Sequence, residues 1–99
     1  MKRLDELTLA RWQSLPATET LLSIADHAKE DRTYKPLVGR LTTRWHASVA
    51  GAEFELLLTG SKFWDTRAKT GGGGAIDLVM HLTSTDFRSA VEALQVRRL

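Results

Sequence analysis

The sequence predicts a small α+β domain, a three-stranded antiparallel meander with two helices before it and two after it. Three observations carry this prediction. Apolar residues recur at helical spacing near both ends of the chain, they alternate with polar residues in its middle, and the whole chain has only 99 residues. A chain of this length forms a single small domain, and 42% apolar with 26% charged residues is a globular balance.

The first predicted helix lies in an N-terminal extension, residues 1–17. Its apolar stripe is irregular, and it stops at Pro16 because the residue before a proline is pushed out of the helical region. We expect Trp12 to supply part of the hydrophobic core. The stripe consists of Leu4, Leu7, Trp12 and Leu15.

The second predicted helix begins at Thr18, whose hydroxyl can cap the first turn, and Glu19 there favours the helix dipole. Apolar residues then follow at the i, i+3, i+4, i+7 spacing of one helix face. A polar run, residues 30–35, leads from this helix into a loop. The apolar face consists of Leu21, Ile24, Ala25 and Ala28.

The middle of the chain changes to the alternation of β-strands. Residues 44–49 and 53–58 alternate apolar and polar side chains on either side of Ala50-Gly51-Ala52, which predicts a hairpin. Gly60-Ser61 makes a second turn, and residues 62–66 are aromatic enough for a third strand. The residues expected to fill the core of this ribbon are Trp45, Phe54, Leu56, Leu58, Phe63 and Trp64.

Two further helices are predicted after a run of four glycines, Gly71 to Gly74. The first is short and buried, over residues 75–82. The second is capped by Asp86 and has helical apolar spacing in Phe87, Ala90, Val91 and Leu94.

The glycine run has two interpretations. Backbone amides that open onto a helix N-terminus can bind a phosphate, including one of a DNA backbone. A phosphate-binding loop, however, places lysine and serine or threonine after its glycines, whereas Lys69 and Thr70 come before them here. Asp77 would also compete for the same amides. We therefore favour the interpretation that the glycines permit a tight crossing from a strand to a helix, rather than nucleotide binding.

Metal binding and catalysis have little support in the sequence. The chain has no cysteine, which excludes disulfides and thiolate zinc sites. His27, His46 and His81 are scattered along the chain and suit structural or surface roles. No acid, base and nucleophile converge by spacing. We therefore expect a protein that is not an enzyme by itself and that needs no metal or cofactor.

Charge is concentrated in the middle of the chain. The net charge is only +2, but residues 32–71 hold seven basic and three acidic side chains. On the third predicted strand, Lys62 and Trp64 share one face, and Phe63 points to the other. A plane for base stacking beside a cation suits nucleic acid. The candidate nucleic-acid-binding residues are Arg40, Arg44, Lys62, Trp64, Arg67 and Lys69. A buried Trp64 among solvated cations is an equally open alternative.

The C-terminal third resembles a known family. Gly-Gly-Gly-Gly-Ala-Ile-Asp-Leu-Val, residues 71–79, followed by Asp-Phe-Arg-Ser-Ala-Val-Glu-Ala-Leu, residues 86–94, is similar to the end of the CHC-type zinc-binding domain of bacterial and plasmid DNA primases. The resemblance covers residues 18–95 and leaves residues 96–99 as a basic tail. It implies a zinc-ribbon-like fold.

The sequence departs from that family at its zinc ligands. The family has a Cys-Pro-x-His pair near its first strand and a Cys-x-x-Cys pair before the glycine turn, and the second pair would fall near Thr66 and Lys69 here. Neither residue is a zinc ligand. The chain thus resembles a zinc-less version of the domain, held together by side-chain packing.

The resemblance implies a binding role on DNA, since in primases this domain holds template DNA and the chemistry lies elsewhere. We expect a cytoplasmic accessory module of plasmid or mobile-element replication or conjugative transfer that binds single-stranded or template DNA. The alternative is an adaptor or inhibitor that docks on a primase, helicase or relaxase and has lost DNA binding. No apolar run reaches the length of a membrane span, so no membrane contact is expected.

Overall fold

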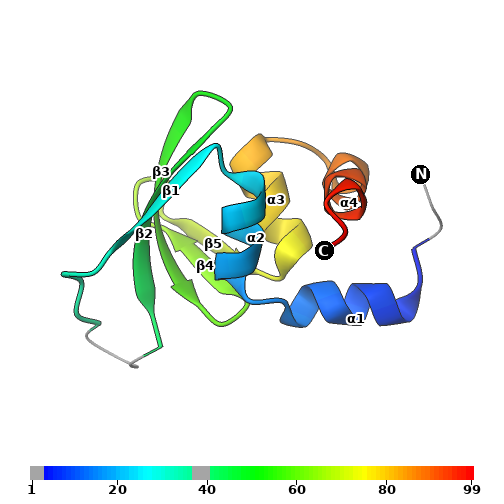
Figure 1. Ribbon diagram of the computed structural model, residues 1–99, viewed down its shortest axis with the longest axis horizontal. Coiled ribbons are helices and arrows are strands. Elements are labelled where there is room, and N and C mark those ends of the chain that lie inside the picture. The colour runs from blue at the N-terminus through cyan, green and yellow to red at the C-terminus, as the bar shows by residue number, and fades with distance from the viewer. Residues whose placement is uncertain (1–3, 37–40) are drawn as a thin grey trace.

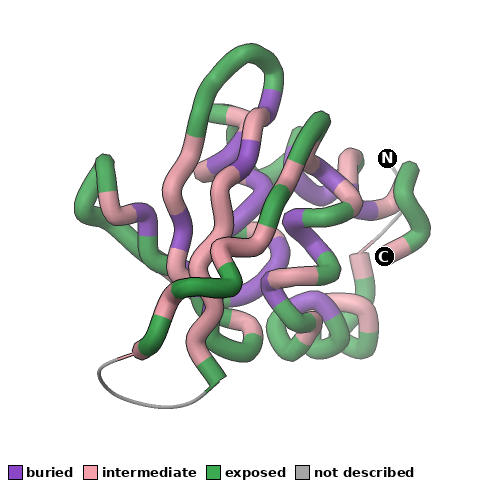
Figure 2. Tube along the Cα trace, turned by 60° about the vertical axis from the view of Figure 1, so that its left-hand side comes forward, coloured by how far each residue is buried: buried purple, intermediate pink, exposed green. Residues whose placement is uncertain are grey.

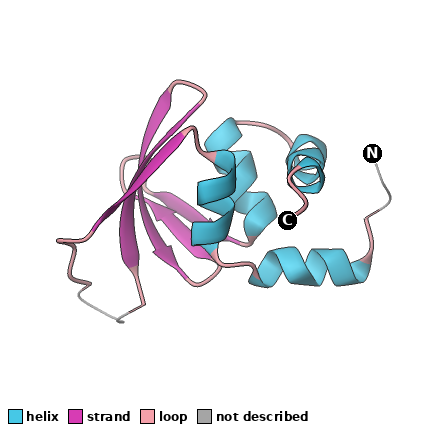
Figure 3. Ribbon diagram, in the orientation of Figure 1, coloured by secondary structure: helices cyan, strands magenta, loops and turns pink. Residues whose placement is uncertain are grey.

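The computed structural model describes residues 4–36 and 41–99, and within them the chain forms two helices, five strands and two more helices. The strands make one antiparallel sheet whose order, β1-β2-β3-β4-β5, is the order of the chain. Figures 1 and 3 show the sheet on one side of the molecule and the helices on the other. The α+β class and the helices at both ends are confirmed, but the sheet has five strands rather than three.

Helix α1 (Glu6–Ser14) begins after Asp5, whose carboxylate accepts a hydrogen bond from the Thr8 amide at 2.7 Å. It ends before Pro16, as predicted. Trp12 is only 1% exposed. The N-terminal extension therefore contributes its large aromatic side chain to the core, as we expected.

Helix α2 (Ala17–Ile24) begins two residues earlier than predicted. Its N-cap is Pro16, and Thr18 lies inside the helix rather than capping it. The fixed backbone angle of proline suits the entry to a helix. The amide of Ala17, which would otherwise lack a partner, donates a hydrogen bond to the Gly60 carbonyl oxygen at 2.7 Å. This bond joins α2 to the turn between β3 and β4.

Strand β1 (His27–Asp31) occupies residues that the sequence assigned to the end of a helix and to a loop. The backbone turns extended at Ala25, directly after α2, and β1 then pairs with β2. Ala28 lies opposite Ala47 in that pairing and packs against the core from a strand. The spacing of Ala25 and Ala28 predicted a helix, but alanine has only a small apolar side chain to pack. The backbone hydrogen bonds that β2 offers decide the structure here.

Strands β2 (Thr43–Val49), β3 (Ala52–Thr59) and β4 (Lys62–Asp65) form the predicted meander. A two-residue turn joins β2 to β3, and both of its residues, Ala50 and Gly51, have positive φ. That geometry matches the right-handed twist of a hairpin.

Strand β5 (Thr70–Gly73) corrects the interpretation of the glycine run. Three of the four glycines pair with β4, and only Gly74 makes the crossing into a helix, with φ at +90°. Glycine is needed in the strand because a Cβ at Gly71 would lie 2.5 Å from the Phe63 carbonyl oxygen. The first three glycines of the run therefore belong to a strand, and the fourth makes the turn into the helix.

Helices α3 (Ala75–Thr83) and α4 (Phe87–Val96) lie where the sequence placed them. Asp86 caps α4 as predicted, because its carboxylate accepts a hydrogen bond from the Ser89 amide at 2.9 Å. Ser84 ends α3 in the left-handed conformation.

One hydrophobic core lies between the sheet and the helices, and Figure 2 shows the buried stretches gathered there, with exposed stretches at the loop tips. Of the expected ribbon residues, Leu56, Leu58 and Phe63 are buried, Trp45 and Phe54 pack against the core partly buried, and Trp64 is excluded from it. The buried residues are Trp12, Ala17, Leu21, Ile24, Ala47, Val49, Leu56, Leu58, Phe63, Ala75, Leu78, Val79, Leu82, Ala90, Val91 and Leu94.

Candidate nucleic-acid interface

The face of the sheet turned away from the helices carries a mixed set of charged, aromatic and aliphatic side chains. We call it the open face. Because side chains alternate along a strand, every second residue of β1 to β4 lies on it. The cross-strand pairs place its members opposite one another. The open face consists of His27, Lys29, Asp31, Arg44, His46, Ser48, Glu53, Glu55, Leu57, Thr59, Lys62 and Trp64.

Strand β4 places Lys62 and Trp64 on the open face and turns Phe63 and Asp65 toward the helices. Phe63 is 6% exposed, whereas Trp64 is 45% exposed. This is the arrangement that the alternation of β4 predicted, so the interpretation of Trp64 as a core residue is wrong. Lys62 forms no ion pair with any residue that the structure describes.

The indole of Trp64 is held by its neighbours in the sheet. Trp64 pairs with Leu57 of β3 on one side and with Gly71 of β5 on the other. A Cβ at Gly71 would lie 2.9 Å from Cε3 of the indole, so the ring covers the glycine. A glycine strand thus lets the ring lie close to the backbone of the sheet edge.

The Glu55 carboxylate, in the middle of the open face, contacts three basic side chains. One carboxylate oxygen lies 2.8 Å from Nδ1 of His46 and 3.6 Å from the Arg67 guanidinium, and the other lies 3.4 Å from the Arg44 guanidinium. The hydrogen bond from His46 is the main reason that the pKa of Glu55 is lowered, and Arg44 adds to it. Two of the predicted DNA contacts are therefore partly neutralised.

His46 lies between two carboxylates. Its Nδ1 is 2.8 Å from Glu55, and its Nε2 is 2.9 Å from Glu53. Both ring nitrogens face acceptors, which only the doubly protonated ring can satisfy. The hydrogen bond to Glu55 raises the pKa of His46, with a smaller contribution from Glu53. The pKa of Glu53 is lowered, chiefly by a hydrogen bond from Ser48 and to a smaller extent by the hydrogen bond from His46.

The turn between β4 and β5, residues 66–69, carries the other predicted cations. Asp65 shapes it, because Oδ1 accepts hydrogen bonds from the amides of Arg67 at 2.9 Å and Ala68 at 3.0 Å. Its Oδ2 lies 2.6 Å from Nε2 of His81 on α3. Lys69 is exposed and has φ at +55°, so the backbone turns sharply at this cation.

Burial of Asp65 is the largest single influence on its pKa and raises it. The hydrogen bonds from Ala68, His81 and Arg67 together outweigh burial, and the pKa of Asp65 is lowered. The carboxylate is therefore ionised although it is only 3% exposed.

This turn does not fit a zinc ion. The Thr66 hydroxyl donates to the Glu55 carbonyl oxygen at 3.2 Å, and Lys69 offers an ammonium. Among the described residues, no group of three or more His, Asp or Glu side chains could hold a metal ion. The Asp65 carboxylate organises the turn instead.

The predicted site residues thus fall into three sets. Lys62 and Trp64 lie together on β4, Arg67 and Lys69 lie on the adjacent turn, and Arg44 lies two strands away. Arg40 lies outside the described residues.

Sequence reasoning missed the acidic residues of the open face. The alternation of β3 was the available signal, because it places Glu53, Glu55 and Leu57 on one side. It also missed Tyr34 and Thr42, which both come from the connection between β1 and β2 and line a hollow beside Trp64.

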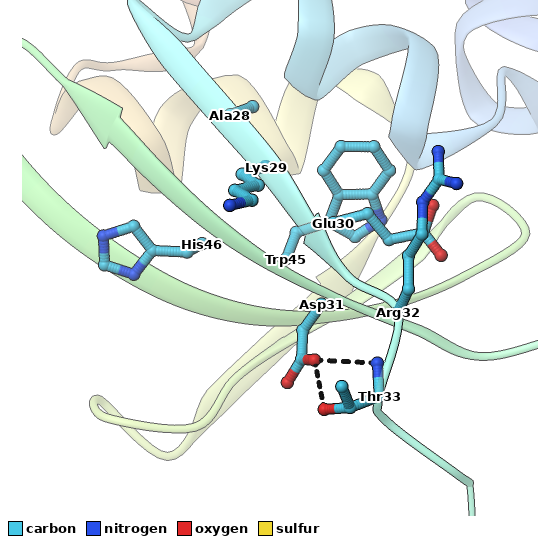
Figure 4. Close-up of a pocket in the computed structure, with 8 residues that line it drawn as sticks. All are labelled: Ala28, Lys29, Glu30, Asp31, Arg32, Thr33, Trp45 and His46. Atoms are coloured by element: carbon cyan, nitrogen blue, oxygen red, sulfur yellow. Dashed lines mark hydrogen bonds between the residues drawn. The ribbon is translucent and has the colours of Figure 1, made fainter.

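A second hollow, of about 790 Å³, lies around edge strand β1 (Figure 4). Lys29 of β1 and His46 of β2 are cross-strand neighbours there. The charges around it are mixed, since Glu30 and Asp31 line it together with Lys29 and Arg32. Asp31 is engaged by Thr33, whose amide and hydroxyl donate to it at 2.9 and 2.6 Å. This hollow has no charge preference that would select a nucleic acid.

Comparison with known proteins gives a partial match. A "65 kDa protein" of Zymomonas mobilis subsp. mobilis is 46% identical over 44 residues, which is 44% of this chain and 8% of that protein. The match therefore concerns a small part of a much longer protein. No family model and no solved structure matches the chain. Within the described ranges, no helix has the length and apolar content needed to cross a membrane.

Proposed function

We propose that this chain is a non-catalytic module that binds single-stranded nucleic acid, DNA in particular, on the open face of its sheet. The observation that carries the proposal is the half-exposed indole of Trp64 beside Lys62, whose ammonium has no ion-pair partner among the described residues. Aromatic rings stack on bases of any sequence, and a cation beside the ring takes the adjoining phosphate.

The turn after β4 extends this site with two cations. Lys69 forms no ion pair with any described residue, and Arg67 reaches Glu55 only at 3.6 Å with its side chain 56% exposed. Exposed ion pairs are weak, so Arg67 can exchange the carboxylate for a phosphate at little cost. We propose that the strand runs from this turn across Trp64 to Lys62.

The biological setting of the proposal rests on the resemblance of residues 71–94 to the primase zinc-binding domain. It supports a cytoplasmic accessory role beside a primase, helicase or relaxase in plasmid or mobile-element replication or conjugative transfer. In that role the chain supplies DNA binding, and a partner supplies the chemistry.

Fluorescence anisotropy with labelled single-stranded and duplex oligonucleotides tests the proposal. Three phosphate contacts, by Lys62, Arg67 and Lys69, predict that log affinity for a single strand falls by about 2 per tenfold rise in salt. Trp64→Ala should weaken binding severalfold, and Phe87→Ala is the matched control because Phe87 is 49% exposed on α4. Micromolar protein that binds no oligonucleotide at low salt would contradict the proposal.

A second candidate is the adaptor or inhibitor. The observation that favours it is the neutralisation of Arg44, His46 and Arg67 by carboxylates on the open face. The two candidates separate in one experiment. An adaptor retains a purified primase, helicase or relaxase after nuclease treatment and binds no oligonucleotide, whereas a DNA-binding module loses its partners with the DNA.

A further inference from the structure

A hollow of about 500 Å³ lies on the open face beside Trp64. Its size falls within the range of small-molecule sites, which is about 300–1,000 Å³. Its lining residues come from β3, from β4 and from the connection between β1 and β2, and none of them is acidic. The lining residues are Tyr34, Thr42, Leu57, Thr59, Lys62, Phe63 and Trp64.

Three of the residues that line the hollow are aromatic, namely Tyr34, Trp64 and the core residue Phe63. Trp64 comes from β4, and Tyr34 comes from the connection between β1 and β2. Leu57 of β3, the cross-strand partner of Trp64, also lines the hollow. Flat apolar surfaces of this kind suit a planar ring.

The polar groups of the hollow are few and adaptable. The hydroxyl oxygens of Thr42 and Thr59 are 2.7 Å apart, and either can donate to the other. Because each hydroxyl has one hydrogen, the pair keeps one donor and several lone pairs for a ligand. The Lys62 ammonium is the one charged group among the lining residues.

We propose that this hollow takes a single unstacked nucleobase of the bound strand, with Lys62 on the adjoining phosphate. This inference rests on the proposed function. The base lies against Trp64 and faces Tyr34, and the threonine hydroxyls bond its edge. A paired base in a duplex cannot enter, so the hollow selects single strands. The absence of acidic lining residues fits a ligand that carries a phosphate.

Oligonucleotides with one 2-aminopurine, a fluorescent base whose emission changes on stacking, test the inference. Binding should change the emission with wild-type protein and with Phe87→Ala, and the change should be lost with Trp64→Ala. Tyr34→Ala and Thr59→Val should reduce affinity, with the loss from Tyr34→Ala between about fivefold and 150-fold.

A change in the ligand gives a second measurement that does not depend on variant folding. An oligonucleotide with one abasic nucleotide should bind wild-type protein severalfold more weakly at one position than at others. Salt-sensitive binding with unchanged 2-aminopurine emission and no effect of an abasic nucleotide at any position overturns this inference but leaves the proposed function standing. Absence of binding to every oligonucleotide contradicts both.

Discussion

Nε2 of His81 lies 2.6 Å from Oδ2 of Asp65 and joins helix α3 to the last residue of β4. The rings of Phe54 and Phe63 flank His81, with centroids 5.7 and 5.2 Å from its own. The contact holds the β4–β5 turn against the helical layer. Asp65 is the charged residue on the side of β4 opposite Trp64.

Asp65→Ala should lower the free energy of unfolding by about 1–3 kcal/mol, because three part-buried hydrogen bonds lose their acceptor. The pKa of Asp65 is lowered in the folded state, so its contribution is present above its unfolded pKa and is lost as pH falls through the folded value. Urea unfolding at pH 7, 5 and 3 measures this. Glu92→Gln, on the surface of α4, is the control, and an equal loss in both variants would contradict the role of Asp65.

The pKa of His46 should lie above its ordinary value, chiefly because of the hydrogen bond to Glu55. The imidazolium and its ion pairs are fully present below pH 6.5 and disappear as pH rises through the folded pKa. DNA affinity should fall as the pH rises through the folded pKa of His46, because the open face then loses one positive charge. An NMR titration of the His46 ring checks this, and in Glu55→Gln the pKa should drop. A ring that titrates unchanged in Glu55→Gln argues against the contact.

Gly71→Ala and Gly73→Ala should differ sharply although both lie in β5. A Cβ at Gly71 would lie 2.5 Å from the Phe63 carbonyl oxygen, whereas at Gly73 the nearest atom is Cγ of Lys62 at 3.7 Å. We expect Gly71→Ala to cost about 1–3 kcal/mol and Gly73→Ala to stay within about 0.5 kcal/mol of wild type. Thermal unfolding of the pair measures the difference. Similar melting temperatures would show that β5 tolerates side chains.

Trp64→Ala and Trp12→Ala should separate binding from folding. Trp12 is 1% exposed, and its truncation should cost about 3–5 kcal/mol. Trp64 is 45% exposed, so its truncation should cost much less while it weakens oligonucleotide binding. Chemical denaturation and anisotropy of both variants provide the test. A Trp64→Ala protein that unfolds as easily as Trp12→Ala would assign Trp64 a structural role.

Local patterns in the sequence predicted the elements with strong signals. The spacing in residues 87–94, the alternation around Ala50-Gly51 and the cap at Asp86 each specify one structure. They failed at β1 and β5, where Ala25 and Ala28 mimic a helix face and glycines mimic a loop. Both strands exist because the adjacent strand supplies hydrogen bonds, and a local pattern does not contain that partner.

Part of the candidate site could likewise be predicted from local patterns, and part of it could not. The alternation of β4 was enough to place Lys62 and Trp64 on one face. The position of Glu55 among Arg44, His46 and Arg67 depends on pairing across strands and on the turn after β4. Its effect on the charge of the open face therefore required the three-dimensional structure.

The identity of strand order and chain order has a consequence for how the domain opens. Each edge strand adjoins a helix in the sequence, since β1 follows α2 after two residues and β5 meets α3 at Gly74. An edge strand therefore cannot detach without pulling on the helical layer. We expect amide hydrogens of β5 and α3 to exchange with solvent together, as one cooperative unit, rather than at the rate of a fraying edge.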